Sequence, residues 1–420
     1  MSTQPEQVLM RKQMRVLMCS DDPNTILSYG ILSKLMLSRL YPYYDIHYLS
    51  LQYQIGNPMP IRTDNGKVMY VKYPAHNQGD RNPQNLPKVI KHLQPDFVWT
   101  NFDVQHYMNI KNLVPQGLSW IGWIPWDNND VGQIPRAQQA FSNLTTKIAI
   151  SKFGMEFLNK HKIGIEDYIY NIIDTDNYYK LQKDDPEFEK FRGMNSWYTP
   201  DTKLLLFVGR PNWRKRIIHV LTIVKELVNR GNKNIKLFMH TSLNDPAATV
   251  NIAELIDALG IKKHVIFSQF NWDQGLPVED LRLLYNVADL YIAPHGGEGF
   301  GMPIGEAMAC GTPFVASDYC TTREFAGESF DRGIPSEVYF PTNPQGQPIL
   351  DRGVHRPYPL VDKFADKIEQ LIYDKDRLEK MGENGIQWVR QNCSPGAVCS
   401  KWKKVFDMYN IKYAMPVGYA

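Results

Sequence analysis

Two glutamates lie in the glycine-rich stretch HGGEGFGMPIGEAMACG, residues 295–311, where their spacing could serve ligand binding or catalysis. Its glycines would let the backbone turn tightly and lie against a ligand. Pro303 favours a helix start and Gly311 a helix end, which puts Glu298 before the helix and Glu306 about one turn inside it. The amides of Gly299 to Gly301 would then lie at a helix N-terminus, where phosphate is the natural anion.

An exposed turn with a solvated Glu306 explains the glycines equally well when they are taken alone. The stretch matches neither the GxGxxG dinucleotide motif nor the P-loop motif, which weakens both of those interpretations. A second group of residues is needed to decide between a ligand site and a turn.

A basic cluster supplies that second group. Arg210, Arg214, Lys215 and Arg216 follow the apolar run LLLFV in the stretch GRPNWRKRI, residues 209–217. Ligands of open α/β sheets bind outside the carboxyl ends of the strands, and a diphosphate would suit this cluster. A solvated helix start is the alternative, but cations are disfavoured at a helix N-terminus, so an anion should compensate them. The run is short and lacks an aromatic stacking surface, so no nucleic acid partner is predicted.

Together, in this order, the two segments resemble the retaining glycosyltransferases of family 4, which have the GT-B fold. That family also has an arginine with a lysine five positions later, here Arg210 and Lys215 after Gly209. Where the family commonly has a glycine pair after the next strand, this chain has Cys320, Thr321 and Thr322. The family's glutamate pattern is matched by Glu298, Gly299, Phe300, Gly301, Pro303, Glu306, Ala307, Met308, Ala309, Gly311 and Pro313.

The resemblance implies a role for each donor-site residue. Arg210 and Lys215 would hold the diphosphate, together with the backbone of Gly209 and of the turn Gly299, Phe300 and Gly301. Glu306 would accept hydrogen bonds from ribose hydroxyls, and Glu298 would contact the donor sugar. A cation about 4 Å from the leaving diphosphate would interact with it by roughly 4 kcal/mol at an effective dielectric constant of ~20. Arg210, Lys215 and Glu298 are therefore the catalytic candidates of the second domain.

The acceptor side is less clearly marked in the sequence. Many family members use a histidine near the sugar, and the corresponding stretch here, WIGWIPWDNNDVG, offers Asp127 and Asp130 and no histidine. Asp127 is predicted to contact the acceptor or to act as a base, and a capping role before Val131 is an equal alternative. Tyr29 and Gly30, in the first strand-to-helix loop, are predicted to contact the acceptor. His106 is a second candidate for the base.

Alternating strand and helix patterns occur twice and predict an α/β fold with two parallel sheets. With the resemblance, the predicted fold is GT-B: two Rossmann-like doubly wound domains facing a cleft, with a C-terminal helix crossing back to the first. The predicted divisions are a tail (1–13), an acceptor-binding domain (14–196), a nucleotide-sugar-binding domain (197–394) and the final helix (395–420). The predicted strands are Val16–Cys19, Ile46–Leu49, Phe97–Thr100, Trp120–Ile124, Lys147–Ile150, Leu204–Val208, Ile235–Met239, His264–Phe267, Leu290–Ala293 and Phe314–Ala316.

Two segments near the domain ends have their own signatures. Residues 174–203 are polar, charged and rich in turn formers, which predicts a linker with the boundary near 196–201. The C-terminal stretch has apolar residues at helical spacing, at Val398, Trp402, Val405 and Phe406, which predicts an amphipathic helix.

Composition limits the partners and the location. The 420-residue chain has 47 basic and 44 acidic residues, so no whole-molecule field attracts it to nucleic acid or a membrane. Its first residues lack the apolar core of a signal peptide, which favours a cytoplasmic protein. The stretch 31–44 mixes apolar residues with Lys34 and Arg39. A core-facing helix is the favoured interpretation, and peripheral contact with a membrane is the alternative.

No metal or cofactor is predicted to be required, apart from the donor substrate. The chain has no CxxC pair and no zinc-type HxxxH, so no structural metal is expected. Asp174, Thr175 and Asp176 spell the DxD metal motif of another glycosyltransferase fold, but a match of three letters arises by chance. Divalent ions are expected to assist at most through the diphosphate.

The predicted activity is retaining transfer of a hexosyl group from a UDP- or GDP-sugar to a hydroxyl of a glycan, lipid-linked or small-molecule acceptor. A sugar-nucleotide hydrolase, epimerase or phosphorylase on the same scaffold is the alternative, as is a non-catalytic binding subunit. The loop 267–277 is predicted to select the nucleobase of the donor. No oligomeric state is predicted. The long insertion 330–359, with Asp351, Arg352 and His355, is interpreted as a lid over the donor or as an irregular loop.

Overall fold

The computed structural model describes residues 13–53, 56–75, 83–246, 248–268 and 275–412. Most of the predicted N-terminal tail and residues 269–274 of the predicted base-selecting loop lie outside these residues. The chain forms two compact units: unit 1 comprises Met1–Trp123, Ala140–Thr146 and Cys399–Ala420, and unit 2 comprises Ile124–Gln139 and Lys147–Val398. Residues 124–139 thus group with unit 2, and the predicted domain boundaries stay predictions.

The first sheet has eight strands in the order β3-β4-β2-β1-β5-β6-β7-β8. The pairings of β1 with β2 and β5, of β2 with β4 and of β5 with β6 are parallel, whereas the edge strand β3 pairs antiparallel with β4. Apart from β3, the strand order is that of a Rossmann fold, with its reversal between β1 and β5. The strands are β1 (Arg15–Ser20), β2 (Asp45–Ser50), β3 (Met59–Arg62), β4 (Val68–Pro74), β5 (Phe97–Asn101), β6 (Ser119–Ile124), β7 (Thr146–Ala149) and β8 (Asp167–Tyr168).

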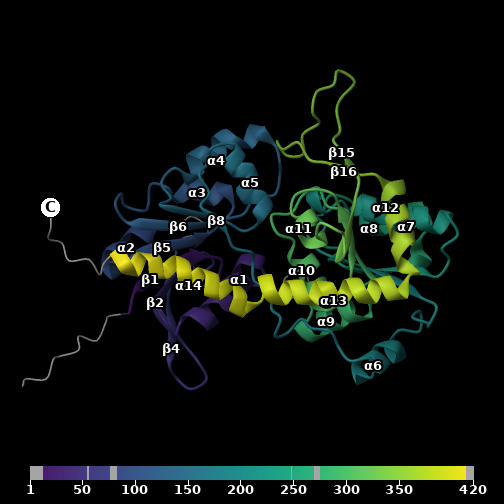
Figure 1. The fold of residues 1–420 in the computed structure, drawn as a ribbon, viewed down its shortest axis with the longest axis horizontal. Coiled ribbons are helices and arrows are strands. Elements are labelled where there is room, and N and C mark those ends of the chain that lie inside the picture. Colours follow the sequence, from purple (N-terminus) through teal and green to yellow (C-terminus); the bar gives the residue numbers. More distant parts are fainter. Residues whose placement is uncertain (1–12, 54–55, 76–82, 247, 269–274, 413–420) are drawn as a thin grey trace, which may run out of the picture. The chain divides into compact units, whose positions relative to one another are not determined.

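Short helices connect these strands (Figure 1). Helix α1 buries Leu32, Met36, Leu37 and Leu40, the spacing of a face turned to a core. Within the described residues, no helix is long and apolar enough to cross a membrane. The helices up to residue 194 are α1 (Ser28–Leu40), α2 (Leu86–Leu93), α3 (Val104–Ile110), η1 (Val131–Gln133), α4 (Ile134–Phe141), α5 (Lys152–Lys160) and α6 (Pro186–Met194).

The second sheet has six strands in the order β11-β10-β9-β12-β13-β14, and all its pairings are parallel. This is the full Rossmann order, with its reversal between β9 and β12. The strands of this sheet are β9 (Lys203–Val208), β10 (Ile235–His240), β11 (Val265–Phe267), β12 (Leu290–Ala293), β13 (Phe314–Ser317) and β14 (Gly333–Ser336). A separate pair, β15 (Val338–Tyr339) and β16 (Tyr358–Pro359), brackets a long loop.

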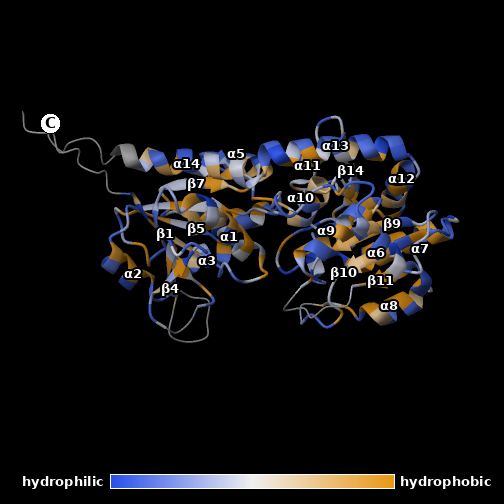
Figure 2. Ribbon diagram, turned by 90° about the horizontal axis from the view of Figure 1, so that it is seen from below, coloured by the Kyte–Doolittle hydropathy of each residue, from blue (hydrophilic) through white to orange (hydrophobic). Residues whose placement is uncertain are grey.

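Helices cover the second sheet and close its core. Leu205 and Phe207 of β9 lie in one buried cluster with Val220 of α7 and Phe364 of α12. Figure 2 shows the resulting pattern: the second sheet is largely hydrophobic, whereas α13 is largely hydrophilic. The helices are η2 (Trp213–Lys215), α7 (Ile217–Asn229), α8 (Ile252–Leu259), η3 (Lys262–His264), α9 (Val278–Val287), α10 (Met302–Ala309), α11 (Thr322–Ala326), α12 (Val361–Ile372), α13 (Lys375–Asn392) and α14 (Pro395–Lys412).

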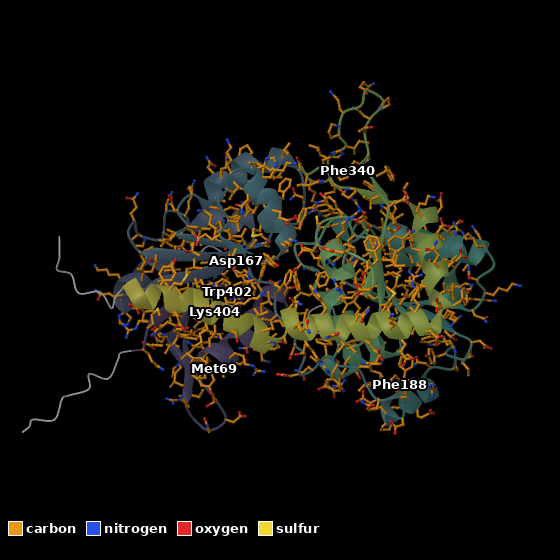
Figure 3. All side chains as sticks on the ribbon, viewed as in Figure 1. Met69, Asp167, Phe188, Phe340, Trp402 and Lys404 are labelled. Carbon is orange, nitrogen blue, oxygen red and sulfur yellow. The ribbon has the colours of Figure 1, made fainter. Side chains whose placement is uncertain are left out.

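The C-terminal helix α14 buries the apolar face predicted from its sequence. Val398, Trp402, Val405 and Phe406 are all buried, as expected. Within unit 1, the Trp402 ring lies 5.6 Å from that of Trp99 and 5.3 Å from that of Trp123. Figure 3 labels Trp402 and Lys404 on this helix, and only Lys404 is exposed. Aromatic burial therefore ties this segment to the first sheet.

All ten predicted strand segments are present, but the segment interpreted as a linker is partly helical. Asp185 accepts a hydrogen bond from the Glu187 backbone and caps α6, and Pro186 occupies its first turn. Phe191 packs its ring against Trp197 and Tyr198. This segment reads as a linker from its polar composition, but it contains the capped helix α6, whose buried residue is Phe191. The strands β3, β4, β8 and β14 to β16 were not predicted either.

Candidate functional site

The two sequence motifs meet at the point where the strand order of the second sheet reverses. The segment 209–216 follows β9, the segment 294–301 follows β12, and these two strands are neighbours. The Gly296 amide donates a hydrogen bond of 2.8 Å to the Arg214 carbonyl, which joins the two loops directly. Since ligands of doubly wound sheets bind at this edge, the topology places both motifs at the expected site.

Glu298 lies among three nitrogen-bearing side chains. Its Oε1 is 2.7 Å from Lys215 Nζ, 2.8 Å from Arg214 Nη1 and 2.7 Å from His295 Nδ1. Burial alone would raise the pKa of Glu298, but Arg214 and Lys215 outweigh it and hold that pKa well below its ordinary value. Burial lowers the pKa of His295 to about 4, so at neutral pH this ring is uncharged and the charged partners of the carboxylate are Arg214 and Lys215.

All four cations of the basic cluster have a carboxylate partner within the protein. Besides the pairs with Glu298, Arg210 makes two hydrogen bonds of 2.7 Å with Asp245, and Arg216 lies 2.5 Å from Asp351. The compensating anions expected from the sequence are thus supplied by the chain itself. Lys215 Nζ donates a hydrogen bond of 2.7 Å to Glu298 Oε1, which uses one of the three N–H groups of its ammonium.

Glu306 lies on α10 and differs in charge from Glu298. Its Oε2 accepts a hydrogen bond of 2.7 Å from the hydroxyl of Tyr285, a fully buried residue of α9. Burial raises the pKa of Glu306 to about 7, against the opposing effects of the Tyr285 hydrogen bond and of Lys215. The resemblance implies that Glu306 accepts hydrogen bonds from ribose hydroxyls, and a pKa of about 7 means that its charged form, the stronger acceptor, predominates only at higher pH.

The predicted turn residues divide into backbone and core positions. Gly297 and Gly301 have φ angles of 129° and 96°, which side chains other than glycine rarely adopt. The Phe300 ring is buried against Tyr170 and Phe325, so only its backbone is available to a ligand. Gly209 lies against the Lys215 side chain, since a Cβ there would be 3.3 Å from Lys215 Cε.

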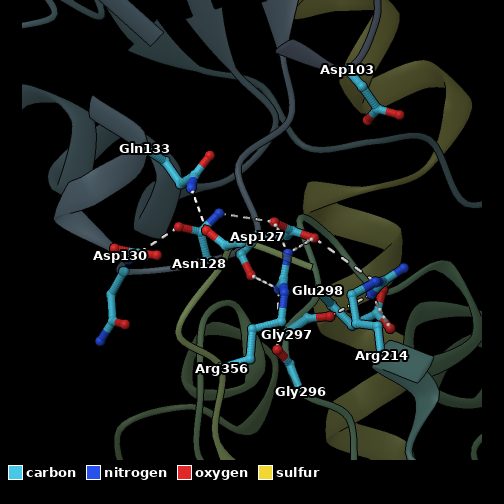
Figure 4. A network of polar contacts seen from close by, with 12 residues as sticks. Asp103, Asp127, Asn128, Asp130, Gln133, Arg214, Gly296, Gly297, Glu298 and Arg356 are labelled. Carbon is cyan, nitrogen blue, oxygen red and sulfur yellow. Dashed lines mark hydrogen bonds and ion pairs between the residues drawn. The ribbon is translucent and has the colours of Figure 1, made fainter. Parts of the chain in front are cut away.

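Asp127 belongs to the same network, although it follows β6 of the first sheet (Figure 4). Its two carboxylate oxygens accept hydrogen bonds of 2.9 and 3.0 Å from Arg356 Nη2, and Arg214 Nε lies 3.8 Å away. The predicted role of Asp127 toward an acceptor stays a prediction. Arg356 was missed at the sequence level, because nothing near it in the chain links it to Asp127.

Cys320 occupies a position where the resemblance anticipates glycine. Its φ of 55° is in the left-handed region, so the backbone keeps the conformation that a glycine would adopt there. The adjacent Thr321 donates hydrogen bonds to the carbonyls of Glu298 and Phe300 and so supports the turn.

The remaining predicted residues lie in unit 1. The Tyr29 hydroxyl donates a hydrogen bond of 2.6 Å to Asp103, which follows β5. Gly30 is sterically required, because a Cβ there would lie 2.4 Å from the Asp22 carbonyl oxygen. His106 packs on the ring of Phe102. Across the described part of the chain, no group of three or more His, Cys, Asp or Glu side chains could hold a metal ion.

Comparison with known proteins finds a family match for the region that contains both motifs. Residues 198–388 match the family described as glycosyl transferases group 1. The D-inositol 3-phosphate glycosyltransferase of Corynebacterium diphtheriae is 28% identical to this chain over 207 residues, 49% of this chain and 42% of that protein. The chain spans less than half the length of the curated relatives that it matches most strongly.

Solved structures resemble nearly the whole chain. Sucrose-phosphate synthase from Thermosynechococcus elongatus superposes with a TM-score of 0.73 at 14% identity, over 95% of this chain and all of that one. Anabaena HepE in complex with UDP and glucose gives a TM-score of 0.66 at 13% identity, over 94% of this chain and all of that one. These proteins have the GT-B fold, so the predicted fold class is confirmed. The matched region, residues 198–388, contains β9 to β14, the basic cluster and both glutamates.

Proposed function

We propose that the protein transfers a sugar from a nucleoside diphosphate sugar to an acceptor hydroxyl, with retention of the anomeric configuration. One observation carries the proposal. Lys215 and Arg214, which follow β9, form ion pairs with Glu298, which follows the neighbouring strand β12. Glu306 lies one turn inside the next helix, α10. Breaking the anomeric C–O bond leaves negative charge on the diphosphate, and fixed cations at this position would stabilise it.

The charges of the network favour an incoming anion. Five basic side chains face four carboxylates, which leaves an excess of one positive charge when His295 and the nearby Glu306 are both neutral. The basic groups are Arg210, Arg214, Lys215, Arg216 and Arg356, and the carboxylates are Asp127, Asp245, Glu298 and Asp351. A diphosphate would bring the charge that this cluster lacks, and roughly 4 kcal/mol per close contact is available at an effective dielectric constant of ~20.

The two glutamates are suited to different parts of the donor. Glu298 is held ionised, so it cannot donate a proton and instead offers negative charge to an oxocarbenium-like sugar. Glu306 is held by Tyr285 through one oxygen, and a carboxylate can accept hydrogen bonds from two adjacent ribose hydroxyls. In this proposal Arg210 and Lys215 bind the diphosphate, and the amides of the Gly299–Gly301 turn assist them.

The comparisons support a nucleotide-sugar donor and leave its base to experiment. HepE was solved with UDP and glucose, and the curated relatives include D-inositol 3-phosphate glycosyltransferases. UDP-sugars are therefore the first donors to test and GDP-sugars the second, with polyol, glycan and lipid-linked acceptors. Transfer is proposed to need no divalent metal, so EDTA should leave the rate within about twofold.

A binding panel followed by product analysis tests the proposal. UDP, GDP and ADP, alone and as sugar conjugates, should raise the melting temperature selectively, since a ligand of the folded state adds RT ln(1 + [L]/Kd) to its stability. NMR of the product should show the anomeric configuration of the donor. An inverted product would disprove retention, a requirement for free phosphate would indicate a phosphorylase, and epimerised donor would indicate an epimerase. The absence of any shift at millimolar nucleotide would overturn the donor site itself.

A further inference from the structure

We propose that Arg356, in the insertion between β14 and α12, is a positioning residue of the donor site and acts through Asp127. The inference rests on the proposed function, because it assigns to the insertion the task of holding the glycine turn and Arg214 in place for the donor. Arg356 donates hydrogen bonds to Asp127 and to the Gly296 carbonyl.

The Arg356 guanidinium binds two loops at once. Its Nη2 donates to both carboxylate oxygens of Asp127, at 2.9 and 3.0 Å, and its Nη1 donates to the Asp127 carbonyl at 2.8 Å and the Gly296 carbonyl at 3.1 Å. The residue is only 5% exposed and lies 5.1 Å from the centre of the Trp213 ring. One side chain thus joins the loop after β6, the glycine turn after β12 and the loop after β9.

Asp127 connects Arg356 to the catalytic candidate Glu298 through Arg214. It lies between Arg356 and Arg214, and Arg214 in turn donates to Glu298 and to the Gly297 carbonyl. Burial would raise the pKa of Asp127, but Arg356 and Arg214 reverse this and lower it. A carboxylate held ionised by two guanidinium groups is a weak base, which favours an anchoring role over proton transfer.

The turn is shaped to receive this guanidinium. A Cβ at Gly297 would lie 2.3 Å from the Asp127 carbonyl oxygen and 2.6 Å from Arg356 Nη1, so a larger residue could not occupy that position. Glycine is needed at Gly297 both for its φ of 129° and for this close approach.

The insertion has further attachments that do not depend on Arg356. The His355 amide donates to Asp130 at 2.9 Å, Gln133 donates to the Gly353 carbonyl at 2.9 Å, and Arg216 pairs with Asp351. Phe340 directly follows β15, at the start of the loop that extends from β15 to β16 (Figures 1 and 3), and its ring packs against the rings of Tyr319 and His355. Replacing Arg356 should therefore leave the insertion folded.

Two variants and a matched control test the inference. Arg356→Gln should lower kcat about tenfold or more at saturating donor while UDP affinity changes less than threefold, because a charge-assisted hydrogen-bond network is lost. Arg356→Lys should recover part of the rate. Arg352→Gln is the control, since Arg352 is exposed in the same insertion and its guanidinium lies 5.8 Å from the centre of the Trp213 ring, away from the hydrogen bonds that Arg356 makes with Asp127 and Gly296. It should stay within twofold, and an equal loss there would overturn the inference.

A double-mutant cycle and a pH profile separate positioning from general structural damage. The double variant Arg356→Gln with Asp127→Asn should be no slower than Asp127→Asn alone, because the two residues act as one unit. Without its arginine, Asp127 should titrate at higher pH, so the acid limb of the Arg356→Gln rate profile should move upward and vanish in the double variant. Additive losses, or an unmoved acid limb, would contradict the proposal.

One measurement does not depend on activity. Hydrogen exchange of the amides in residues 294–301 should become faster in Arg356→Gln and in Asp127→Asn, and should not change in Arg352→Gln. Unchanged exchange in the first two variants would overturn the positioning role. Faster exchange in a protein that shows no sugar transfer would instead reject the proposed function and retain the structural inference.

Discussion

Each of the two sheets carries a buried lysine–carboxylate pair near its carboxyl edge, and the two pairs differ in their surroundings. In unit 1, Lys72 of β4 lies 3.0 Å from Asp22, which also accepts hydrogen bonds from the Ser50 hydroxyl and the Asn24 amide. The Lys72 ammonium lies 5.0 Å from the centre of the Tyr53 ring. The chain thus supplies several partners for each charge of this pair.

The pair in unit 2 lies in a different environment. Lys215 and Glu298 are 2.7 Å apart and similarly buried, but Arg214 shares the carboxylate and a glycine turn carries Glu298. Neighbouring pairs add to a network with a surplus of positive charge. Burial of an ion pair therefore does not identify a site. A surplus of positive charge next to a glycine turn, whose backbone can approach a ligand, indicates a site better than burial does.

The largest expected effect is on turnover in Glu298→Gln. This change keeps the shape and removes the charge next to the donor sugar, so kcat should fall by roughly 100- to 1,000-fold, as when other preorganised electrostatic groups are removed. UDP affinity should not weaken, because Lys215 and Arg214 are released toward the diphosphate. Steady-state kinetics and calorimetry measure the two quantities, and a variant with full turnover would remove Glu298 from the mechanism.

The second prediction compares the two lysines directly. Lys215→Met should weaken UDP binding by roughly 10- to 100-fold and uridine binding hardly at all, since a charge-assisted hydrogen bond to phosphate is lost. Lys72→Met should leave UDP affinity unchanged and lower the stability of the fold by about 3–5 kcal/mol, because it strands a buried Asp22. Calorimetry and urea unfolding measure both, and equal losses of UDP and uridine in Lys215→Met would end its assignment to the diphosphate.

The third prediction concerns pH. The pKa of Glu306 is about 7, and hydroxyl donors of a ribose would favour its charged form. Nucleotide affinity should therefore rise with pH through about 7 and then level off, because binding releases a proton. Glu306→Gln should remove this dependence and weaken binding about tenfold.

Tyr285→Phe is the matched variant for this pH effect. The Tyr285 hydroxyl lowers the pKa of Glu306, so its removal should move the midpoint of the affinity profile to higher pH. A profile that is flat in the unchanged protein would mean that ribose does not bind at Glu306.

The smallest expected effect lies in unit 1. Tyr29→Phe removes the hydroxyl that donates a hydrogen bond to the Asp103 carboxylate and should raise the acceptor KM by roughly threefold to tenfold. UDP affinity should stay the same, as it should in Tyr43→Phe, a variant of an exposed tyrosine in the same unit. If UDP affinity changed in Tyr29→Phe, the separation of donor and acceptor residues between the two units would be wrong.

Residues that are close in sequence were predictable, because local geometry links them. Glu298, the glycine turn and Glu306 follow one strand and begin one helix, and Gly209 to Lys215 follow another, so strand and helix periodicity places both motifs. Tyr285, Arg356 and the Lys72–Asp22 pair could not be predicted in their roles. In each case the interacting residues are far apart in the chain, and only the packing of sheets and loops brings them together.

The sequence by itself determined ten of the strands, an α/β fold with two parallel sheets and the glycine-rich and basic motifs, because periodicity, glycine and charge act within a few residues of one another. The GT-B fold class followed from the family resemblance of those motifs. The tertiary structure alone decided how those charges are balanced. It gave each cation of the basic cluster a carboxylate, brought Glu306 to a pKa of about 7 and seated Arg356 on Asp127. Pairing and burial depend on which distant groups share a low-dielectric environment, and that is set only when the chain has folded.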